Sequence, residues 1–224
     1  MNYCLIGAPG VGKGTFSKLL INRLKLHHIS VGDIVRNEIK QETIVGKKVQ
    51  KYVECGHLIP DEVVNEVVHQ ELHKFNFSNC LLDGFPRTTV QADILDNYLK
   101  NPLRAVHIQL DKSVAVEKLL GRQLCVGCGR GFNKADIRRD GYDMPAILPG
   151  EYEACPRGAE ECRQHRSLHV RSDDTRETIL RRFEVFESET LPLLRFYENS
   201  DRLRTLDVKR GVGDIEELIR IMTS

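Results

Sequence analysis

A glycine-rich stretch near the start of the chain, "GAPGVGKGT" at residues 7–15, holds the first residues that could do chemistry. Glycine lets the backbone curl so tightly that successive N–H groups point inward at phosphate oxygens. Between a strand and a helix, these amides and the positive helix end would hold the phosphates of one nucleotide, with Lys13 reaching the terminal ones. The predicted cradle comprises Gly10, Val11, Gly12, Lys13, Gly14 and Thr15. The stretch alone predicts binding of a nucleoside triphosphate, against the alternative of an ordinary strand-to-helix turn.

A second stretch, "LLDGFPRT" at residues 81–88, places an acidic and a basic side chain after another apolar run. Asp83 would stand at the carboxyl end of a buried strand, where a magnesium ion with its water ligands is held beside a phosphate loop. Arg87 follows four residues later, either as a phosphate ligand or as a surface arginine after a proline turn. Open parallel sheets bind ligands beyond the carboxyl ends of their strands, which favours the site interpretation.

Five short apolar runs must form the strands that carry these turns. Stretches with helical spacing separate them, so the pattern predicts right-handed crossovers and an α/β, three-layer fold with a five-stranded parallel sheet. The predicted strands are residues 3–7, 27–31, 79–84, 104–110 and 203–208. A last helix is expected from Asp214, which would be its N-cap.

Residues 125–168 show neither strand nor helix periodicity and are rich in Gly, Pro, Arg and Cys, which indicates an inserted small domain. Cys125 and Cys128 have the spacing of a zinc knuckle. Cys155 and Cys162 are six residues apart, so a structural Cys4 zinc site and a set of thiols without metal both remain open. His165 is a possible replacement ligand.

The composition narrows the class of protein. The 224 residues carry 33 Lys+Arg against 32 Asp+Glu, and this balance argues against a protein that coats nucleic acid or a membrane surface. No stretch approaches the roughly 18 apolar residues of a membrane helix. A strand starts almost at once, which leaves no room for a targeting segment, so we expect a cytoplasmic protein with reduced cysteines.

Taken together, six segments in order resemble the adenylate kinases of the nucleoside monophosphate kinase family. They are "GAPGVGKGT", "HISVGDIVR" (28–36), "GHLIPDEVV" (56–64), "LLDGFPRTTVQAD" (81–93), "LLGR" (119–122) and "RSDDTRETILRR" (171–182). The family has its own "GKGT" form of the phosphate loop, which accounts for Gly14 between Lys13 and the Thr15 hydroxyl.

The resemblance implies a magnesium-dependent, reversible transfer of the γ-phosphoryl group from ATP to AMP, giving two ADP. It implies a P-loop core (1–29, 60–120 and 175–224), a monophosphate-binding segment (30–59) and a lid (121–174), in a chain expected to be a monomer without nucleic-acid or membrane partners. The long lid resembles the zinc-bearing lids of some relatives.

The resemblance also implies roles for individual residues. The catalytic set would be Lys13, Asp83, Arg87, Arg122, Arg171, Arg182 and the lid-hinge acids Asp173 and Asp174, although these two acids could equally be a solvated helix cap. ATP would additionally contact Arg122, Gly131, Phe132 and Arg210. AMP would contact Val31, Arg36, His57, Leu58, Ile59, Gly84, Phe85, Pro86, Arg87, Gln91, Arg171 and Arg182. Planar guanidinium groups suit this work because each bonds two phosphate oxygens at once.

Two departures from the family pattern leave the bases open. Val31 replaces a hydroxyl residue beside the acceptor base, while Gln91 is retained and favours AMP over UMP or CMP. Lys118 replaces an arginine that contacts the donor, so ATP and GTP both remain candidate donors. A nucleotide-dependent switch and a zinc-ribbon nucleic-acid binder are the alternatives from other classes, but each leaves "DGFPR" and "RSDD" unexplained.

Overall fold

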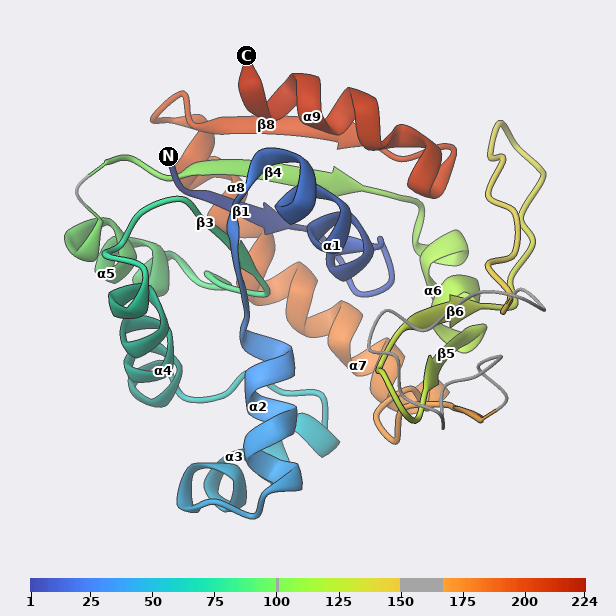
Figure 1. Cartoon of the computed structure of the whole chain (residues 1–224), viewed down its shortest axis with the longest axis horizontal. Coiled ribbons are helices and arrows are strands. Elements are labelled where there is room, and N and C mark those ends of the chain that lie inside the picture. Colours follow the sequence, from blue (N-terminus) through green and yellow to red (C-terminus); the bar gives the residue numbers. More distant parts are fainter. Residues whose placement is uncertain (100, 150–166) are drawn as a thin grey trace.

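A five-stranded parallel sheet forms the centre of the computed structural model, which describes residues 1–99, 101–149 and 167–224 (Figure 1). Its strand order is β2-β3-β1-β4-β8. The elements in chain order are β1 (Tyr3–Ile6), α1 (Lys13–Leu24), β2 (His27–Ser30), α2 (Val31–Lys40), α3 (Ile44–Glu54), α4 (Asp61–Lys74), β3 (Cys80–Asp83), α5 (Thr89–Tyr98), β4 (Arg104–Gln109), α6 (Lys112–Leu120), β5 (Arg122–Cys125), β6 (Gly131–Asn133), β7 (Leu168–His169), α7 (Arg176–Val185), a π-helical turn (Phe186–Thr190), α8 (Leu191–Glu198), β8 (Leu203–Asp207), a 3-10 turn (Gly211–Asp214) and α9 (Ile215–Thr223).

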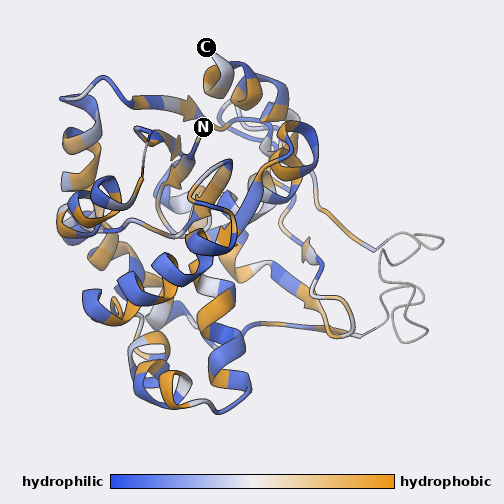
Figure 2. Cartoon of the chain, turned by 60° about the vertical axis from the view of Figure 1, so that its left-hand side comes forward, coloured by the Kyte–Doolittle hydropathy of each residue, from blue (hydrophilic) through white to orange (hydrophobic). Residues whose placement is uncertain are grey.

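The five predicted strands are confirmed, and so is the parallel sheet. Their near-continuous apolar runs suit strands that are covered on both faces. Side chains alternate across the sheet, so Tyr3 and Leu5 of β1 enter one hydrophobic cluster while Cys4 and Ile6 enter the other. The first cluster lies under α1, α6, α7 and α9, and the second under α2 to α5 and α8. Along these helices hydrophobic and hydrophilic residues alternate in patches (Figure 2).

A small antiparallel sheet, in the order β6-β5-β7, stands apart from the main one (Figure 1). It begins directly after α6 and ends shortly before α7, so its two connections to the core lie close to the predicted hinge at residues 121 and 174. Its own hydrophobic cluster is little more than the buried side chains of Cys125 and Phe132.

The segment that follows β6 folds back onto the core, a feature that the sequence did not predict. Residues 133–147 form an irregular hairpin with bridges at Asn133–Ile147 and Ile137–Met144. Ile137 and Met144, together with Tyr142, are buried in the same cluster as α6 and α9. We call residues 133–147 the core-packed hairpin; it is the yellow loop that extends from β6 in Figure 1.

The last helix begins where the sequence predicts, but Asp214 does not cap it with its side chain. Its carboxylate instead accepts the backbone N–H groups of Lys209 and Arg210, at 2.9 and 2.7 Å, and the Arg210 Nε–H at 2.9 Å. Asp214 is the N-cap residue of α9, as predicted, but its side chain holds the loop before the helix and makes no capping hydrogen bond. None of the helices in the described part of the chain is both long and apolar enough to cross a bilayer.

Candidate active site

The glycine-rich loop joins β1 to α1 and is pressed against α6. A Cβ atom on Gly10, which has a φ of 85°, would lie 2.4 Å from the Ala115 carbonyl oxygen, so only glycine fits there. At the start of α1, Lys13 bends back over the loop, and its Nζ donates to the carbonyl oxygens of Gly7 (2.6 Å) and Ala8 (3.0 Å). These contacts close the loop into a ring, and backbone N–H groups at the start of a helix can bind an anion.

Asp83 ends β3 beside this loop and is almost fully buried. A Cβ on Gly14 would lie 3.3 Å from Asp83 Oδ2, so the glycine of "GKGT" allows the helix start to approach the carboxylate. On its other side, His28 Nε2 stands 3.8 Å from Asp83 Oδ2 and has no hydrogen-bond partner in the described part of the chain. The carboxylate oxygens of Asp83 are hard ligands of the kind that magnesium with its water ligands takes.

Two buried acids just before α7, Asp173 and Asp174, pair with arginines from β5 and α7. Arg122, at the start of β5, donates from Nε to Asp174 Oδ2 (2.8 Å) and from Nη2 to Asp174 Oδ1 (2.5 Å). Arg182 donates to Asp173 and stands 3.8 Å from Asp174. Both acids are buried, and the charges of Arg182, Arg36 and Arg171 outweigh burial to lower the pKa of Asp173. The pairs fix two guanidinium groups at one place.

The cations at this site repel one another. Burial lowers the pKa of Lys13 to about 8; Asp83 opposes the shift, while Arg87, Arg122 and Arg182 add to it. Burial, Arg122 and Arg36 likewise lower the pKa of Arg171 to about 10, and its Nε is buried without a partner in the described chain. Positive charges that lie this close together, and that nearby carboxylates do not fully neutralise, create a strong electrostatic potential that attracts a polyanion.

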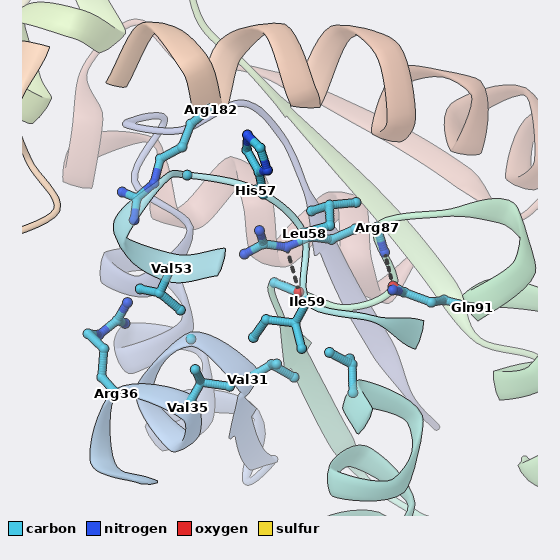
Figure 3. A pocket seen from close by; sticks show the side chains of 14 residues that line it. Val31, Val35, Arg36, Val53, His57, Leu58, Ile59, Arg87, Gln91 and Arg182 are labelled. Atoms are coloured by element: carbon cyan, nitrogen blue, oxygen red, sulfur yellow. Dashed lines mark hydrogen bonds between the residues drawn. The ribbon is translucent and has the colours of Figure 1, made fainter. Parts of the chain in front are cut away.

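A pocket opens between α2, the α3–α4 loop and β3, and Figure 3 shows it from close by. In this view Arg36 lies beside Val35 and Val53, while Arg87 and Arg182 lie across from Val31 and Val35. The lining residues are Val31, Gly32, Val35, Arg36, Val53, Gly56, His57, Leu58, Ile59, Val64, Gly84, Arg87, Gln91 and Arg182. A lining that combines apolar side chains with several guanidinium groups suits a ligand with a flat ring and a phosphate.

The predicted acceptor residues fall into two groups. Val31, Arg36, His57, Leu58, Ile59, Gly84, Arg87, Gln91 and Arg182 line the pocket. Phe85 and Pro86 are buried and are not lining residues, so they shape the turn beneath it. Arg171 is also not a lining residue; its Nη2 is 3.9 Å from Asp33, which in turn accepts from Arg36 at 2.6 Å.

The Gln91 side chain makes two hydrogen bonds within the protein that the sequence did not predict. Its Oε1 accepts the backbone N–H of Arg87 at 2.7 Å, and its Nε2 donates to Asp61 Oδ1 at 2.6 Å. Arg87 also donates from Nε to the Gly84 carbonyl at 2.9 Å (Figure 3). Although the side chain reaches solvent, desolvation and the guanidinium of Arg182 lower the pKa of Arg87. Gln91 therefore first holds the turn that presents Arg87.

The predicted donor-base residues lie around α6. In β6, Gly131 is exposed, whereas Phe132 is buried in the small cluster with Cys125. Arg210 lies in the loop after β8 and is held by Asp214. Lys118, on the last turn of α6, has its Nζ 3.5 Å from Met144 Sδ of the core-packed hairpin. Sequence reasoning missed Met144 because no local motif marks it.

Only part of the predicted metal site is described. Cys125 and Cys128 stand at the turn between β5 and β6, where the N–H of Gly129 donates to the Cys125 carbonyl at 2.9 Å. Cys155, Cys162 and His165 lie outside the described residues. Within residues 1–99, 101–149 and 167–224, no three His, Cys, Asp or Glu side chains are grouped to hold a metal ion.

Comparison with known proteins shows full-length relatives. The sequence model of the adenylate kinase family matches residues 5–202. A GTP:AMP phosphotransferase of Plasmodium falciparum (isolate 3D7) is 36% identical, over 100% of this chain and 96% of the relative. Adenylate kinases of Alkaliphilus oremlandii (strain OhILAs) and Geobacillus sp. (strain WCH70) are 38% and 37% identical, over 96% and 98% of this chain and 94% and 98% of the relatives. The chain belongs to the adenylate kinase family.

Proposed function

We propose that this chain transfers the γ-phosphoryl group of ATP reversibly to AMP, giving two ADP. One observation carries the proposal: the phosphate loop and the pocket lined by Arg36 and Arg87 flank one cluster of cations, which includes Lys13, Arg122 and Arg182. In the transfer, an oxygen of the AMP phosphate forms a bond to the γ-phosphorus while the bond to the β–γ bridging oxygen breaks. No enzyme group becomes covalently bonded.

On the donor side, the N–H groups of Gly10 to Thr15 would hold the ATP phosphates, with Lys13 at the β- and γ-phosphates. Arg122, Arg171 and Arg182 would bind the oxygens of the γ-phosphoryl group during transfer. Because the protein already holds these guanidinium groups in place, they would stabilise its negative charge without moving. Asp83, through water, and the Thr15 hydroxyl would hold magnesium. When bound, the ion neutralises charge on the β- and γ-phosphate oxygens.

On the acceptor side, the pocket would take AMP. Arg36 and Arg87 would clamp its single phosphate, and the valine-lined wall would cover the base. Gln91 would be the polar group at the base edge: its Nε2 has a second hydrogen besides the one given to Asp61, and can donate it to a ring nitrogen. Val31 offers packing only, so the preference for AMP over UMP or CMP would rest on fit and on Gln91.

A second donor, GTP, is favoured by one comparison and by one departure from the family pattern. A relative that aligns with the whole chain is named a GTP:AMP phosphotransferase. The resemblance implies an arginine that contacts the donor nucleotide at the position of Lys118, and a lysine cannot stack flat on a base as a guanidinium does.

For the lid, we propose a structural zinc ion held by Cys125, Cys128, Cys155 and Cys162. Support comes from the first pair, since its two thiols flank a hairpin turn at knuckle spacing, and from the small hydrophobic cluster of this sheet, which a metal would reinforce.

We propose that the chain is a cytoplasmic monomer and that its partners are nucleotides alone. Cys4, Cys55 and Cys80 are free thiols, which a reducing compartment favours.

An acceptor panel tests the function. With ATP and magnesium fixed, ADP formation is measured against AMP, UMP, CMP and GMP. The proposal predicts that AMP gives the highest kcat/KM. Equal rates across the panel would contradict AMP as the acceptor, and no ADP from any acceptor would contradict the function itself.

A further inference from the structure

Lys118 lies on the helix that borders the phosphate loop. Gly10 packs against the Ala115 carbonyl oxygen of α6, and Lys118 follows three residues later, which is about one helical turn along the axis. A nucleotide whose phosphates occupy the loop would therefore extend its nucleoside along this side of α6.

The ammonium of Lys118 lacks strong acceptors. Its Nζ contacts Met144 Sδ at 3.5 Å, and no oxygen of the described residues accepts a hydrogen bond from it. Burial lowers the pKa of Lys118, although the charge of Asp214 opposes the shift. An ammonium has three donors and a thioether is a weak acceptor, so at least one N–H remains for a ligand.

The surroundings of this ammonium are built by distant parts of the chain. A Cβ on Gly211, in the loop after β8, would lie 3.8 Å from Lys118 Nζ and 3.7 Å from Met144 Cγ. Met144 is held by two backbone hydrogen bonds with Ile137, each 2.9 Å long, and by the next-door bond from the Asp143 N–H to the Lys209 carbonyl at 2.9 Å. A soft thioether, a bare glycine backbone and an ammonium thus meet at one place.

This arrangement can distinguish purines by the group at position 6. Guanine and hypoxanthine carry an oxygen there, which accepts a hydrogen bond, whereas adenine carries an amino group, which donates. A lysine ammonium cannot accept from that amino group, but it bonds the oxygen with the added strength of a charged donor.

We infer that the donor site accepts 6-oxopurine triphosphates as well as ATP, and that the Lys118 ammonium, held beside Met144 and Gly211, is the group that binds the 6-oxygen. The inference rests on the proposed phosphoryl transfer and names a residue for its donor specificity. Thioether and glycine surfaces would accept either purine ring, so discrimination falls to the ammonium.

The experiment compares ATP, GTP and ITP as donors to AMP in the full chain, as kcat/KM for each donor. ITP keeps the 6-oxygen and lacks the 2-amino group of GTP, so it isolates the contact in question. The test variant is Lys118→Met, and the matched control is Lys112→Met, which removes an exposed lysine from the first turn of the same helix. Thermal unfolding of both variants checks that they are folded.

We expect the wild-type chain to use GTP and ITP. In Lys118→Met, the kcat/KM ratios of GTP to ATP and of ITP to ATP should both fall about 10- to 100-fold, the usual effect of one charged hydrogen bond. Lys112→Met should leave both ratios unchanged. Equal losses with all three donors, or no transfer from GTP and ITP in the wild type, would overturn the inference. If ATP still serves as a donor in either case, the proposed phosphoryl transfer is not contradicted. If no donor supports transfer, both the proposed function and the inference about Lys118 are wrong.

Discussion

Arg122, at the start of the small sheet, and Asp174, just before α7, form a two-point ion pair, with Nε–Oδ2 and Nη2–Oδ1 distances of 2.8 and 2.5 Å. The carboxylate is fully buried, while the guanidinium is one-quarter exposed. Asp174 thus aims one face of Arg122 and leaves other N–H groups of its fork free for a phosphate. The pair is an example of how acids at this site orient cations that would otherwise repel.

Arg122→Met should lower turnover by about 10²- to 10³-fold, since one preorganised electrostatic group contributes on that scale. The measurement is kcat at saturating ATP and AMP. Arg138→Met is the matched control, because Arg138 is an exposed arginine paired with Asp136 and is not among the predicted site residues. Near-normal turnover in a folded Arg122→Met chain would remove Arg122 from the site.

Arg87→Gln should also lower kcat/KM for AMP by about 10²- to 10³-fold, because it removes one of the two pocket-lining arginines proposed to clamp the AMP phosphate. The KM for ATP should change much less, since the donor phosphates are assigned to the glycine-rich loop. Steady-state kinetics with each nucleotide varied in turn would separate the two. Equal rises in both KM values would argue that Arg87 is not specific to the acceptor.

The pKa of Lys13, lowered to about 8, predicts a pH dependence of the free enzyme. Below that pH the ammonium is charged and attracts the donor phosphates; above it, the neutral amine does not. Since kcat/KM reports groups of the free enzyme, kcat/KM for ATP should fall as pH rises through about 8. In Lys13→Arg, whose guanidinium stays charged, any residual activity should lack this fall. A flat profile in the wild type up to pH 9.5 would contradict the assignment.

Tyr142→Phe tests whether the core-packed hairpin is part of the core. The Tyr142 hydroxyl donates to Asp111 Oδ2 at 2.6 Å, and the ring lies 4.4 Å from Lys209 Nζ. Losing the hydroxyl should lower the free energy of unfolding by about 1 kcal/mol. Denaturant unfolding measures this change, with Tyr52→Phe, at an exposed tyrosine, as the control. Equal stabilities of the two variants would mean that the hairpin detaches without cost.

The proposed zinc site predicts that gently purified protein carries close to one zinc per chain by elemental analysis. Cys125→Ser should abolish that content, because a thiolate ligand is lost. Cys55→Ser, at an exposed free cysteine, should leave it unchanged. Zinc well below one equivalent in the wild type would show that these thiols hold no structural metal.

Local patterns predicted most of the core. The glycine-rich loop and the strand beginning at Cys80 are each contiguous in sequence, so their spacing alone indicates their structure. The contacts of Met144 could not be predicted, because its partners Lys118 and Gly211 lie 26 and 67 residues away and no periodicity links them. Phe132 illustrates the same limit, since one short strand does not reveal which face packs inward.

The side-chain hydrogen bonds of the site could not be predicted from local sequence patterns. Gln91 is recognisable from its motif, yet its bond to Asp61 depends on how α4 and α5 pack. Asp214 was correctly placed at a helix start, but its carboxylate turns to the preceding loop, where it accepts hydrogen bonds from three N–H groups. Such choices depend on which donors the tertiary fold brings near, and no short stretch of sequence contains that information.

The most direct test of two nucleotides held end to end is to follow the γ-phosphoryl group itself. ATP labelled with ³²P at the γ-position is mixed with AMP, magnesium and the chain, and the products are separated. The account predicts that the label appears at the β-position of ADP, and that omitting AMP abolishes its transfer. Label released only as inorganic phosphate, or retained on ATP in the complete mixture, would contradict it.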